Sequence, residues 1–421
     1  MSVTASTLTE LDDLAKDLYT NYYAPQMAMG TPLKAQLDQV EEWDFSGREM
    51  VFGLKLETGG GVANAGAGKS LPDNADGTYD QARVSPVRTY ARLALDLFAA
   101  EISKQKKGSF RPFLQEKMDD RMKALVKDCN RQLFGDGTGK LAMTGTGAAS
   151  ATQTLSKAYG ATNGGNPAKH IYKGDNLAFY DNAGSLIGKR KVTAKTATLG
   201  AATVAVTLAS TITSITDGWV AKATSDDDNY AFGEANGLLS AFVQSGSFQS
   251  VPVAGTYAAL VLTNSGTLRD ISDTTVMTGF TSTQALSDEV PNLIVTRPGI
   301  IQKYSEIFLP IRRIDGQEVQ LRGGYKPMSV FQHAAGEAPI LTDVDCPGAR
   351  LFGLNTTYLK KIDMVGDEWA AQDGATLNRI SDQDGVEGYI RKYWQLAWQK
   401  LNCHFMVEDI NDIATADRTH S

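Results

Sequence analysis

Two stretches of strict hydrophobic–polar alternation stand out in the first quarter of the chain. Residues 50–57 (MVFGLKLE) and 87–98 (VRTYARLALDLF) keep one side apolar, a pattern typical of half-buried strands. The apolar sides are Met50, Phe52, Leu54 and Leu56, and Thr89, Ala91, Leu93, Leu95 and Leu97. Between them, residues 58–80 are rich in Gly, Ala, Asn and Asp. We predict one long antiparallel hairpin with an exposed tip, and because a lone hairpin is marginal in water, we expect it to lie on a neighbouring copy.

A spacing of three to four residues between apolar positions predicts a long helix over residues 110–134. Its apolar face consists of Leu114, Met118, Met122, Leu125, Cys129 and Leu133. Ser109 is placed to cap it, Pro112 falls in the first turn, where proline is tolerated, and Gly135 supplies the stop. A helix of this length suits a spine that carries other elements along it.

A shorter amphipathic helix is predicted near the N-terminus. Thr7 and Glu10 form a capping-box pattern, and Pro25 ends the helix. Its apolar face consists of Leu11, Leu14, Leu18 and Tyr22. Residues 24–47 are predicted to be extended chain. The apolar anchors of that segment are Leu33, Leu37, Trp43 and Phe45. We expect the tethered helix to dock on another element or another subunit.

The rest of the chain mixes strands and helices, which indicates an α+β fold. Residues 135–170 are rich in turn residues, whereas 171–224 contain short β-prone runs (NLAFY, KVTAK, VAVTL, WVAKA), which predict a small inserted barrel or sandwich. SDDDN at 225–229 is the expected exit linker. NLIVT predicts a buried strand, RPGIIQKYSEIF a helix, and residues 338–364 a strand, a turn and a further strand or short helix. Residues 389–407 fit both periods, and we predict mostly strand there.

Composition narrows the class of protein. Of the 421 residues, 42% are apolar and 21% charged, so the chain can bury a sizeable core. The net charge of −7 argues against a dedicated nucleic-acid-binding domain, which is normally basic. Three scattered cysteines exclude a disulfide framework. No secretory signal and no apolar run of membrane-spanning length is visible. We therefore expect a soluble protein made in a cytoplasm.

Motifs that could carry chemistry are weak. GAGKS at 66–70 lacks the earlier glycine of a phosphate-binding loop, because Ala63 stands there, and Leu-Pro-Asp follows instead of a helix, so we interpret it as a loop tip. The only close Cys–His pair is Cys403 and His404, which we interpret as a core cysteine and a surface histidine. The basic clusters at 104–107 (KQKK) and 188–191 (GKRK) lack interleaved aromatic residues, so we interpret them as solvated faces.

Asp343 and Asp345 are the one candidate carboxylate pair. On a strand they would share a face and could serve a metal or acid–base chemistry, but a structural role is favoured. The arginines nearby in the sequence are Arg312, Arg313 and Arg350. One hypothesis for function is an enzyme whose site combines Asp343, Asp345 and His333. We predict no catalytic, cofactor-binding or metal-binding residues, no cofactor, and no enzymatic activity.

The order of these elements resembles the major capsid protein of tailed double-stranded DNA bacteriophages, the Hong Kong 97-type fold. Three segments carry the resemblance: NRQLFGDGTGKLA at 130–142, PNLIVTRPGIIQKYSEIFLPIRR at 291–313 and EAPILTDVDCPGARLFGLNTTYLKKIDM at 337–364. They look like the exit of the family's spine helix, its strand–helix unit and its late peripheral strands. The inserted region looks like the extra domain that some members carry.

The resemblance implies a domain for each region. Residues 1–47 would be the N-arm, and 48–98 the extended loop reaching over a neighbouring subunit. The remaining expected regions are a peripheral domain with spine helix and connector at 99–170, an inserted β-barrel-like domain at 171–229, an axial domain at 230–336, peripheral strands at 337–384, and C-terminal axial strands with a tail at 385–421.

The resemblance also implies a function and partners. The chain would assemble into the hexamers and pentamers of an icosahedral shell around double-stranded DNA, held without sequence-specific binding. A separate scaffolding protein, a portal and a decoration protein are the expected partners, no membrane is involved, and the virion, assembled in the cytoplasm of a bacterial host, is the expected location. Some members cross-link a loop lysine to an asparagine. Lys69 lies in the loop, but no asparagine or carboxylate matches, so we predict no cross-linking.

Two other classes of structural protein remain open at this point. The inserted β-domain also fits a phage tail or appendage protein, which would form trimers, tubes or fibres. The shell of a non-viral encapsulating compartment shares the capsid fold, and the sequence does not tell what a shell encloses.

Overall fold

The described part of the chain forms two compact units in the computed structural model. The first unit contains 91–124 and 369–390, and the second contains 30–90, 125–368 and the residues from 391 onward. The predicted N-terminal helix, the basic cluster at 104–107, Ser109 and the predicted linker at 225–229 lie outside the described residues. The structure describes residues 30–37, 42–43, 47–98, 113–160, 166–196, 203–223, 233–255, 257–308, 330–333, 336–371, 376–381 and 384–412.

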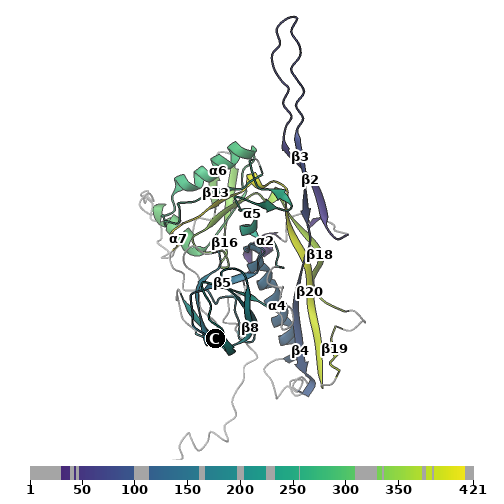
Figure 1. The fold of residues 1–421 in the computed structure, drawn as a ribbon, viewed down its shortest axis with the longest axis vertical. Helices are drawn as coiled ribbons and strands as arrows, with labels where there is room; N and C mark the ends of the chain where they lie inside the picture. Colours follow the sequence, from purple (N-terminus) through teal and green to yellow (C-terminus); the bar gives the residue numbers. More distant parts are fainter. Residues whose placement is uncertain are drawn as a thin grey trace, which may run out of the picture. The chain divides into compact units, whose positions relative to one another are not determined.

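The predicted hairpin is present, but its second strand differs from the prediction. Strand β2 (Met50–Glu57) pairs antiparallel with β3 (Thr78–Val84), and the two strands lead into the long loop at 58–77 (Figure 1). The strand β4 (Val87–Asp96), which carries the predicted alternation, pairs instead with β20 (Gly385–Trp398). Pairing 50–57 with 87–98 was therefore wrong, because alternation identifies a buried face but does not identify the partner strand.

A short helix interrupts the segment that was predicted to be extended. Helix α2 (Pro32–Leu37) begins with a proline, which suits the first helical position because its missing N–H needs no partner there. Leu33 and Leu37 lie one turn apart and are both buried. The predicted apolar anchors are thus confirmed at these two residues, whereas the extended conformation around them is wrong.

The predicted spine helix is confirmed as α4 (Phe113–Leu133). Three of its predicted apolar positions, Leu125, Cys129 and Leu133, are buried. The helix ends at the predicted glycine, where the N–H of Gly135 donates to the carbonyl of Gln132 at 2.9 Å. The apolar stripe therefore predicted both the helix and its buried face correctly.

A five-stranded sheet combines residues from both ends of the chain. Its order is β1 (Glu42–Trp43), β18 (Leu359–Trp369), β20 and β19 (Asn378–Arg379), with β4 also paired to β20. β1 runs parallel to β18, and β19 antiparallel to β20. β20 and the later β21 (Phe405–Val407) confirm the prediction that the block at 389–407 is mostly strand.

The predicted inserted β-domain is a closed antiparallel barrel that begins earlier than expected. Two of its strands come from 135–170, which was predicted to be a turn-rich connector; the glycine- and threonine-rich link TGTGAAS hid their alternation. Closure pairs every strand edge of the barrel. Around the barrel the strands are β10 (Trp219–Lys222), β5 (Lys140–Thr144), β6 (Ser150–Ala158), β9 (Val204–Ile212), β8 (Leu186–Lys195) and β7 (Asn176–Tyr180).

A six-stranded mixed sheet forms the second large core. Its central strand β14 is buried throughout, as the run NLIVT predicted, and pairs parallel with β16 and antiparallel with β17. The sheet thus joins segments that the domain prediction placed on two sides of a boundary at 337, because partners far apart in sequence leave no local signal. In order, the strands are β13 (Leu260–Leu262), β21, β17 (Leu351–Leu354), β14 (Leu293–Thr296), β16 (Gly336–Thr342) and β15 (Val330–His333).

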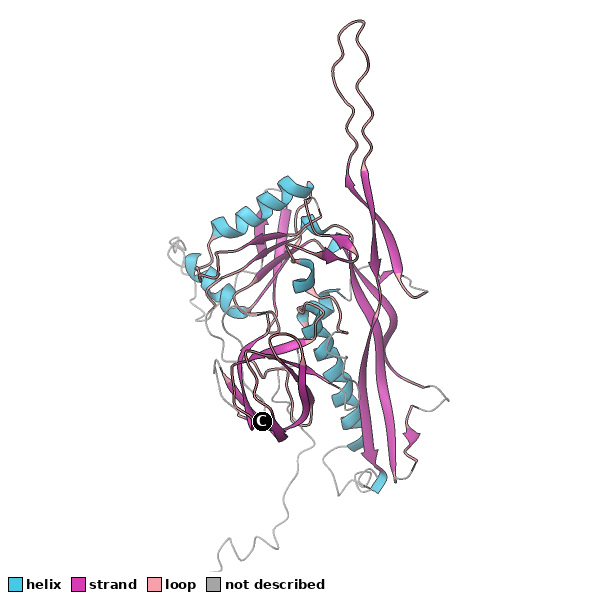
Figure 2. Cartoon of the chain, viewed as in Figure 1, coloured by secondary structure: helices cyan, strands magenta, loops and turns pink. Residues whose placement is uncertain are grey.

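Two helices accompany this sheet (Figure 2). Helix α7 (Pro298–Phe308) was predicted, whereas α6 (Asp273–Ser287) was not. Ser272 caps α6 by accepting a hydrogen bond from the N–H of Thr275 at 3.2 Å. The other short elements are α5 (Leu238–Ala241), β11 (Ser247–Phe248), β12 (Val251–Pro252), η2 (Thr356–Tyr358) and η3 (Leu401–Cys403).

Phe405 of β21 fixes how closely α6 approaches the sheet. A Cβ added to Gly279 of α6 would lie 2.6 Å from its ring, and one added to Gly353 of β17 would lie even closer. Phe280 packs edge-on against the same ring at a centroid distance of 5.2 Å. The two glycines therefore make room for the aromatic ring on which the helix and the sheet meet.

We predict that Gly279→Ala lowers the free energy of unfolding by about 1–3 kcal/mol, because the methyl group overpacks the Phe405 contact. Alanine at an unconstrained helix position would instead stabilise by roughly 0.5–1 kcal/mol. Urea unfolding measures the difference. Gly366→Ala is the matched control, since a Cβ at that exposed position of β18 meets nothing within 4 Å. A Gly279→Ala protein as stable as the wild type would contradict the packing argument.

Candidate functional site

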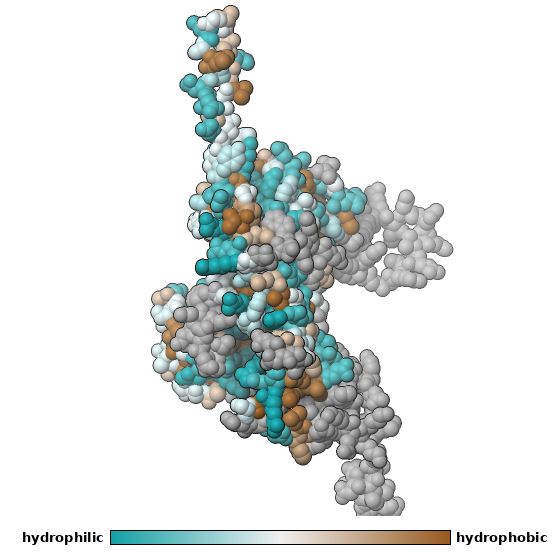
Figure 3. Space-filling model, turned by 90° about the vertical axis from the view of Figure 1, so that its right-hand side faces the viewer, coloured by the Kyte–Doolittle hydropathy of each residue, from teal (hydrophilic) through white to brown (hydrophobic). Residues whose placement is uncertain are grey.

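The hairpin loop at 58–77 is exposed along almost its whole length. All 20 residues between β2 and β3 are exposed except Gly77, which is half-buried. Val62 is 96% exposed and Leu71 is 82% exposed. Figure 3 shows hydrophilic and hydrophobic residues interspersed along the hairpin. A loop of this length is uncommon in compact domains and usually carries function.

The GAGKS motif lies within this loop and is followed by no helix, which agrees with its interpretation as a loop tip. The N–H of Lys69 donates to the carbonyl of Gly66 at 3.1 Å, which closes a small turn. A phosphate-binding loop needs the amides at the beginning of a helix, and the described residues here provide none.

The root of the hairpin, in contrast, is anchored firmly. Val84 of β3 packs in a cluster with Ile362 and Ala397. The N–H of Arg83 donates to the carbonyl of Gln249 at 2.9 Å, and the amide of Gln249 donates to the carbonyl of Leu396 at 3.2 Å. Gln249 has a φ of 51°, a left-handed conformation that surrounding contacts must hold in place. The loop therefore begins from a fixed base.

Asp343 and Asp345 are brought together, but in a turn after β16 and not on a strand face. Asp343 is fully buried and accepts hydrogen bonds from the N–H of Leu33 at 3.2 Å and from the N–H of Asp345 at 2.8 Å. The side-chain amide of Asn130 on α4 donates to Asp343 at 3.1 Å and to Asp345 at 2.9 Å. The same amide group accepts from the N–H of Lys34 at 3.1 Å.

Lysines, and not the predicted arginines, form the ion pairs with Asp345. Asp345 lies 3.1 Å from the ammonium group of Lys169 and 3.8 Å from that of Lys127. Arg350 pairs with Glu408 instead, at 3.0 Å. Arg312 and Arg313 lie outside the described residues. Asp343 and Asp345 are thus held by hydrogen bonds and ion pairs, although the Oδ1 of Asp345 has charged neighbours but accepts no hydrogen bond. This arrangement agrees with the structural role that was favoured for them.

The ionisation states follow from burial and from these neighbours. Burial alone would raise the pKa of Asp345, but His170, Lys169 and Lys127 together lower it to about 2. Burial raises the pKa of Asp343. Burial also lowers the pKa of His170 to about 3, so its imidazole is neutral at pH 7 and the two lysines balance Asp345 there.

A second buried ionic group fixes the barrel to the spine helix. Asp128 of α4 lies 2.8 Å from the ammonium group of Lys222 on β10 and 3.1 Å from the guanidinium of Arg131. Burial opposes ionisation of Asp128, but Arg131 and Lys222 hold its pKa well below the ordinary value. The barrel is therefore attached to α4 by charge as well as by the chain.

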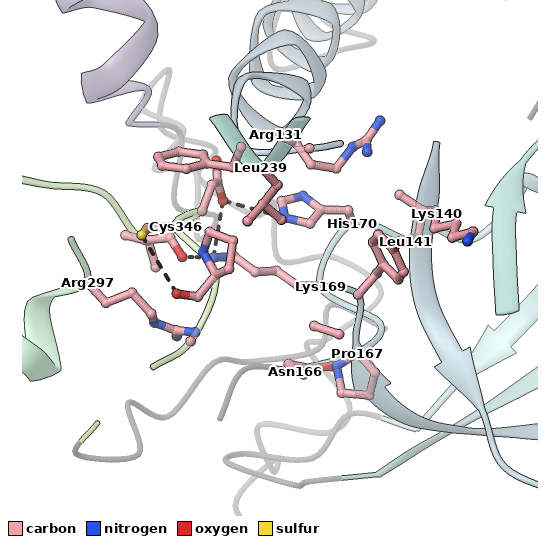
Figure 4. Close-up of a pocket in the computed structure, with 18 residues that line it drawn as sticks. Arg131, Lys140, Leu141, Asn166, Pro167, Lys169, His170, Leu239, Arg297 and Cys346 are labelled. Atoms are coloured by element: carbon pink, nitrogen blue, oxygen red, sulfur yellow. Dashed lines mark hydrogen bonds and ion pairs between the residues drawn. The ribbon is translucent and has the colours of Figure 1, made fainter. Parts of the chain in front are cut away.

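The pocket beside Asp345 is too small for a typical substrate. Lys169 and His170 point toward the turn that carries Cys346 (Figure 4). The pocket volume is about 70 Å³, whereas ligand pockets usually measure about 300–1,000 Å³. Burial raises the pKa of Cys346 above its ordinary range, so the thiol is not a nucleophile at neutral pH.

The other histidines do not assemble into a site. His333 stacks on Phe280 at a centroid distance of 5.2 Å and is not among the residues that contact Asp343 or Asp345. Cys403 is buried, as predicted, but His404 is buried as well, which corrects the expectation of a surface histidine. Its Nδ1 accepts from the N–H of Asn355 at 3.0 Å, and burial lowers its pKa to about 3. His420 lies outside the described residues.

The outward face of α6 is a surface that the sequence reasoning missed. Met277 is 40% exposed and Leu286 is 56% exposed, and no charged residue occurs between Asp273 and Asp288. A charge-free exposed helix face is typical of contact surfaces, where charged residues are depleted. The uncharged run TTVMTGFTSTQALS in the sequence indicated such a surface. The helix was not predicted because the apolar residues in this run follow the helical period only weakly.

The described residues contain neither a candidate metal cluster nor a candidate membrane-spanning helix. They contain no group of three or more His, Cys, Asp or Glu residues that could hold a metal ion. None of the helices there is both long and apolar enough to cross a membrane. The basic run at 188–191 lies on β8 of the barrel.

Comparison with solved structures identifies the fold. The chain is similar to the capsid protein in the asymmetric unit of cyanophage A-1(L), with a TM-score of 0.62 and 13% identity over 96% of this chain and 99% of that chain. It is also similar to the capsid chain of an empty GTA particle, with a TM-score of 0.52 and 7% identity over 97% and 100% of the two chains. No protein-family model and no curated protein matches the sequence. At these identities the likeness concerns the fold, and it confirms the predicted α+β capsid fold.

We predict that Asn130→Ala lowers the free energy of unfolding by about 2–4 kcal/mol, because it removes donors from two buried carboxylates and the acceptor of the Lys34 N–H. Urea unfolding measures the loss. Amide hydrogen exchange should show that the N–H of Lys34 loses protection. Asn182→Ala, at an exposed turn between β7 and β8, is the control and should change neither quantity. Unchanged stability of Asn130→Ala would refute the proposed role of the cluster.

We also predict that the Asp345 carboxylate stabilises the fold in a pH-dependent way. Its pKa is about 2 in the folded protein and about 3.9 in an unfolded chain. The lowered pKa contributes about 2–3 kcal/mol above pH ~4, and this contribution disappears as the pH falls through about 2. The difference in free energy of unfolding between the wild type and Asp345→Asn should therefore shrink as the pH is lowered, and urea unfolding at a series of pH values measures it. A stability difference that does not vary with pH would contradict the assignment, and the exposed Asp73→Asn serves as control.

Proposed function

We propose that this chain, which has the fold of phage capsid proteins, is a major capsid protein that forms the hexamers and pentamers of an icosahedral shell enclosing double-stranded DNA. The exposed hairpin loop carries the proposal. It joins an anchored root to 20 residues that bury almost nothing within the chain. In an assembly such a loop can order and bury its residues on a neighbouring copy.

The predicted regional roles become proposals with boundaries adjusted to the structure. Residues 1–47 would be the N-arm, and the extended loop would comprise β2, β3 and the residues between them. The spine helix α4 and the five-stranded sheet would form the peripheral domain, and the six-stranded sheet with α6 and α7 the axial domain around the capsomer centre. The barrel would be the inserted domain. The charge-free face of α6 suits contact between axial domains.

The proposed partners and location follow from a shell. A separate scaffolding protein and a portal would act in assembly, a decoration protein would bind the shell, and the DNA would be held without sequence-specific contacts. The location would be the virion, after assembly in the cytoplasm of a bacterial host. The hydrogen bonds and ion pairs that hold Asp343 and Asp345 support a structural role for this pair.

Two alternatives remain distinguishable by experiment. A phage tail or appendage protein would form tubes, trimers or fibres. A non-viral encapsulating compartment would form closed shells that enclose protein cargo and not DNA. Negative-stain electron microscopy of the purified chain, with and without a candidate scaffolding protein, separates the first alternative, and analysis of the contents of native particles separates the second.

We predict that replacing residues 58–77 by an Asn-Gly turn abolishes shell formation and leaves the chain folded. Glu57 and Thr78 already face each other across the hairpin, and a two-residue turn can join them. Electron microscopy should show wild-type shells and none for the variant, while circular dichroism and the unfolding midpoint remain unchanged.

Replacement of the loop by a Gly-Ser linker of equal length is the control for the specific side chains. It should also fail to form shells if the loop's residues make the contacts. Normal shells from the shortened variant would overturn the proposed role of the loop.

A further inference from the structure

The barrel carries a charge opposite to that of the rest of the chain. Residues 140–223 contain nine Lys and Arg residues against three Asp and no Glu, a net charge of +6, whereas the whole chain carries −7, so the remaining residues together carry −13. The nine basic residues are Lys140, Lys157, Lys169, Lys173, Lys189, Arg190, Lys191, Lys195 and Lys222. A separation of this size within one chain favours association between unlike parts of two copies.

The pairing of β7 with β8 brings two of these residues close together, one just before β7 and one on β8. Lys191 lies opposite Asn176 in the β7–β8 register. Lys173 is adjacent, because the N–H of Gly174 donates to the carbonyl of Val192 at 2.9 Å. Both lysines are exposed, and within the described residues neither has an ion-pair partner. We call Lys173 and Lys191 the basic strip. Arg190 does not belong to it, because it lies opposite the buried Leu177 and its guanidinium donates to backbone carbonyls.

The barrel's own acids do not neutralise this strip. Asp175 accepts from the N–H of Tyr172 at 2.9 Å, and Asp181 accepts from the N–H of Ser185 at 2.7 Å. Asp217 accepts from the hydroxyl of Thr146 at 3.1 Å. Asp175 and Asp181 thus close local turns, and Asp217 joins two loops of the barrel. Within the described residues none of the three forms an ion pair with Lys173 or Lys191, so the strip keeps its positive charge toward solvent.

The hairpin loop has the complementary charge. The loop at 58–77 contains Asp73 and Asp76 against Lys69, a net charge of −1. With Glu57 and Asp80 on the flanking strands, residues 57–80 carry a net charge of −3. Asp73 and Asp76 lie in the fully exposed part of the loop, and within the described residues neither carboxylate has an ion-pair partner. The only side-chain hydrogen bond of Asp76 there is from the amide of the neighbouring Asn74, at 3.1 Å.

Nucleic acid is a poorer match for the strip. Single-stranded binding surfaces add exposed aromatic rings on which bases stack. Tyr180 and Trp219 of the barrel are buried and stack on each other at a centroid distance of 4.0 Å. Tyr172, beside Lys173, is half-buried, and the ammonium groups of Lys195 and Lys222 lie over its ring at 5.2 and 5.8 Å. The strip therefore offers charge without stacking, which suits carboxylates on a protein.

We propose that the acidic hairpin loop of one copy docks on the basic strip of a second copy. This inference rests on the proposed assembly into a shell and names the surface that receives the loop. The contact joins different patches of the two copies, so it can continue around a closed ring. Exposed ion pairs are worth roughly 0–1 kcal/mol each, so the contact should chiefly set orientation and association rate, and salt should weaken it.

A charge exchange in the full-length chain tests the proposal. Lys173→Glu with Lys191→Glu, and Asp73→Lys with Asp76→Lys, should each slow assembly about tenfold or more at low salt. The protein carrying all four changes should recover to within about threefold of the wild type, since the ion pairs form again with exchanged signs. Light scattering measures the rate, electron microscopy the particles, and circular dichroism the folding of each variant.

A matched control and a second measurement keep the outcome clear. Lys157→Glu removes an exposed positive charge from β6 of the same barrel and should assemble normally, unlike Lys191→Glu. A synthetic peptide of residues 57–80 should bind the full-length wild type in a salt-dependent way and lose binding to the strip variant. The charge-reversed peptide should bind that variant instead.

Each other result overturns the proposal. The loop–strip contact would be excluded if the folded strip and loop variants assembled like the wild type. It would also be excluded if the protein with all four substitutions assembled as slowly as either double variant. Strip variants that assemble normally but lose co-purifying nucleic acid would assign the strip to nucleic acid. If the wild type forms no shells under any condition, the proposed function itself fails, which is a separate result from failure of the charge exchange.

Discussion

The first turn of α2 is held by side chains from distant parts of the sequence. The N–H groups of Leu33 and Lys34 lack carbonyl partners, as in every helix N-terminus, and Asp343 and Asn130 accept from them. Burying the carboxylates is tolerable only because Asn130 and the lysines supply donors and opposite charge. The segment before the hairpin, the spine helix and the turn after β16 therefore form one polar unit, and removing a member leaves the others unsatisfied.

The sequence predicted those elements whose periodicity is strong and locally determined. The apolar stripe of α4, the buried run of β14 and the alternation of β2 identified each element correctly. Helix α6 was missed because five threonines and Gly279 give it low helix propensity. The packing of Phe280 and its neighbours on the sheet, together with the Ser272 cap, stabilises it. The partner of β2 was also missed, since pairing depends on turn and packing geometry that alternation does not encode.

The candidate site could be predicted only in part for a related reason. The sequence predicted Asp343 and Asp345 as a carboxylate pair. A structural role was favoured because such pairs are more often solvated or ion-paired than catalytic. Their partners could not be found, because Asn130 lies more than 200 residues away in the sequence. Likewise, the excess of lysine in the barrel can be counted from the sequence, but the proximity of Lys173 to Lys191 becomes visible only through the strand register.

The root of the hairpin is stabilised within the chain, whereas its loop is exposed and free to contact another molecule. Contacts of Val84, Arg83 and Gln249 form within one chain and give the loop a fixed origin. The loop itself gains nothing from folding, so its ordering must be offset by contact with another molecule. In the proposed shell, weak contacts would suffice because symmetry repeats them and each added subunit would engage several neighbours at high effective concentration. Single contacts that remain weak also let a misplaced subunit dissociate, which favours a uniform closed shell over irregular aggregates.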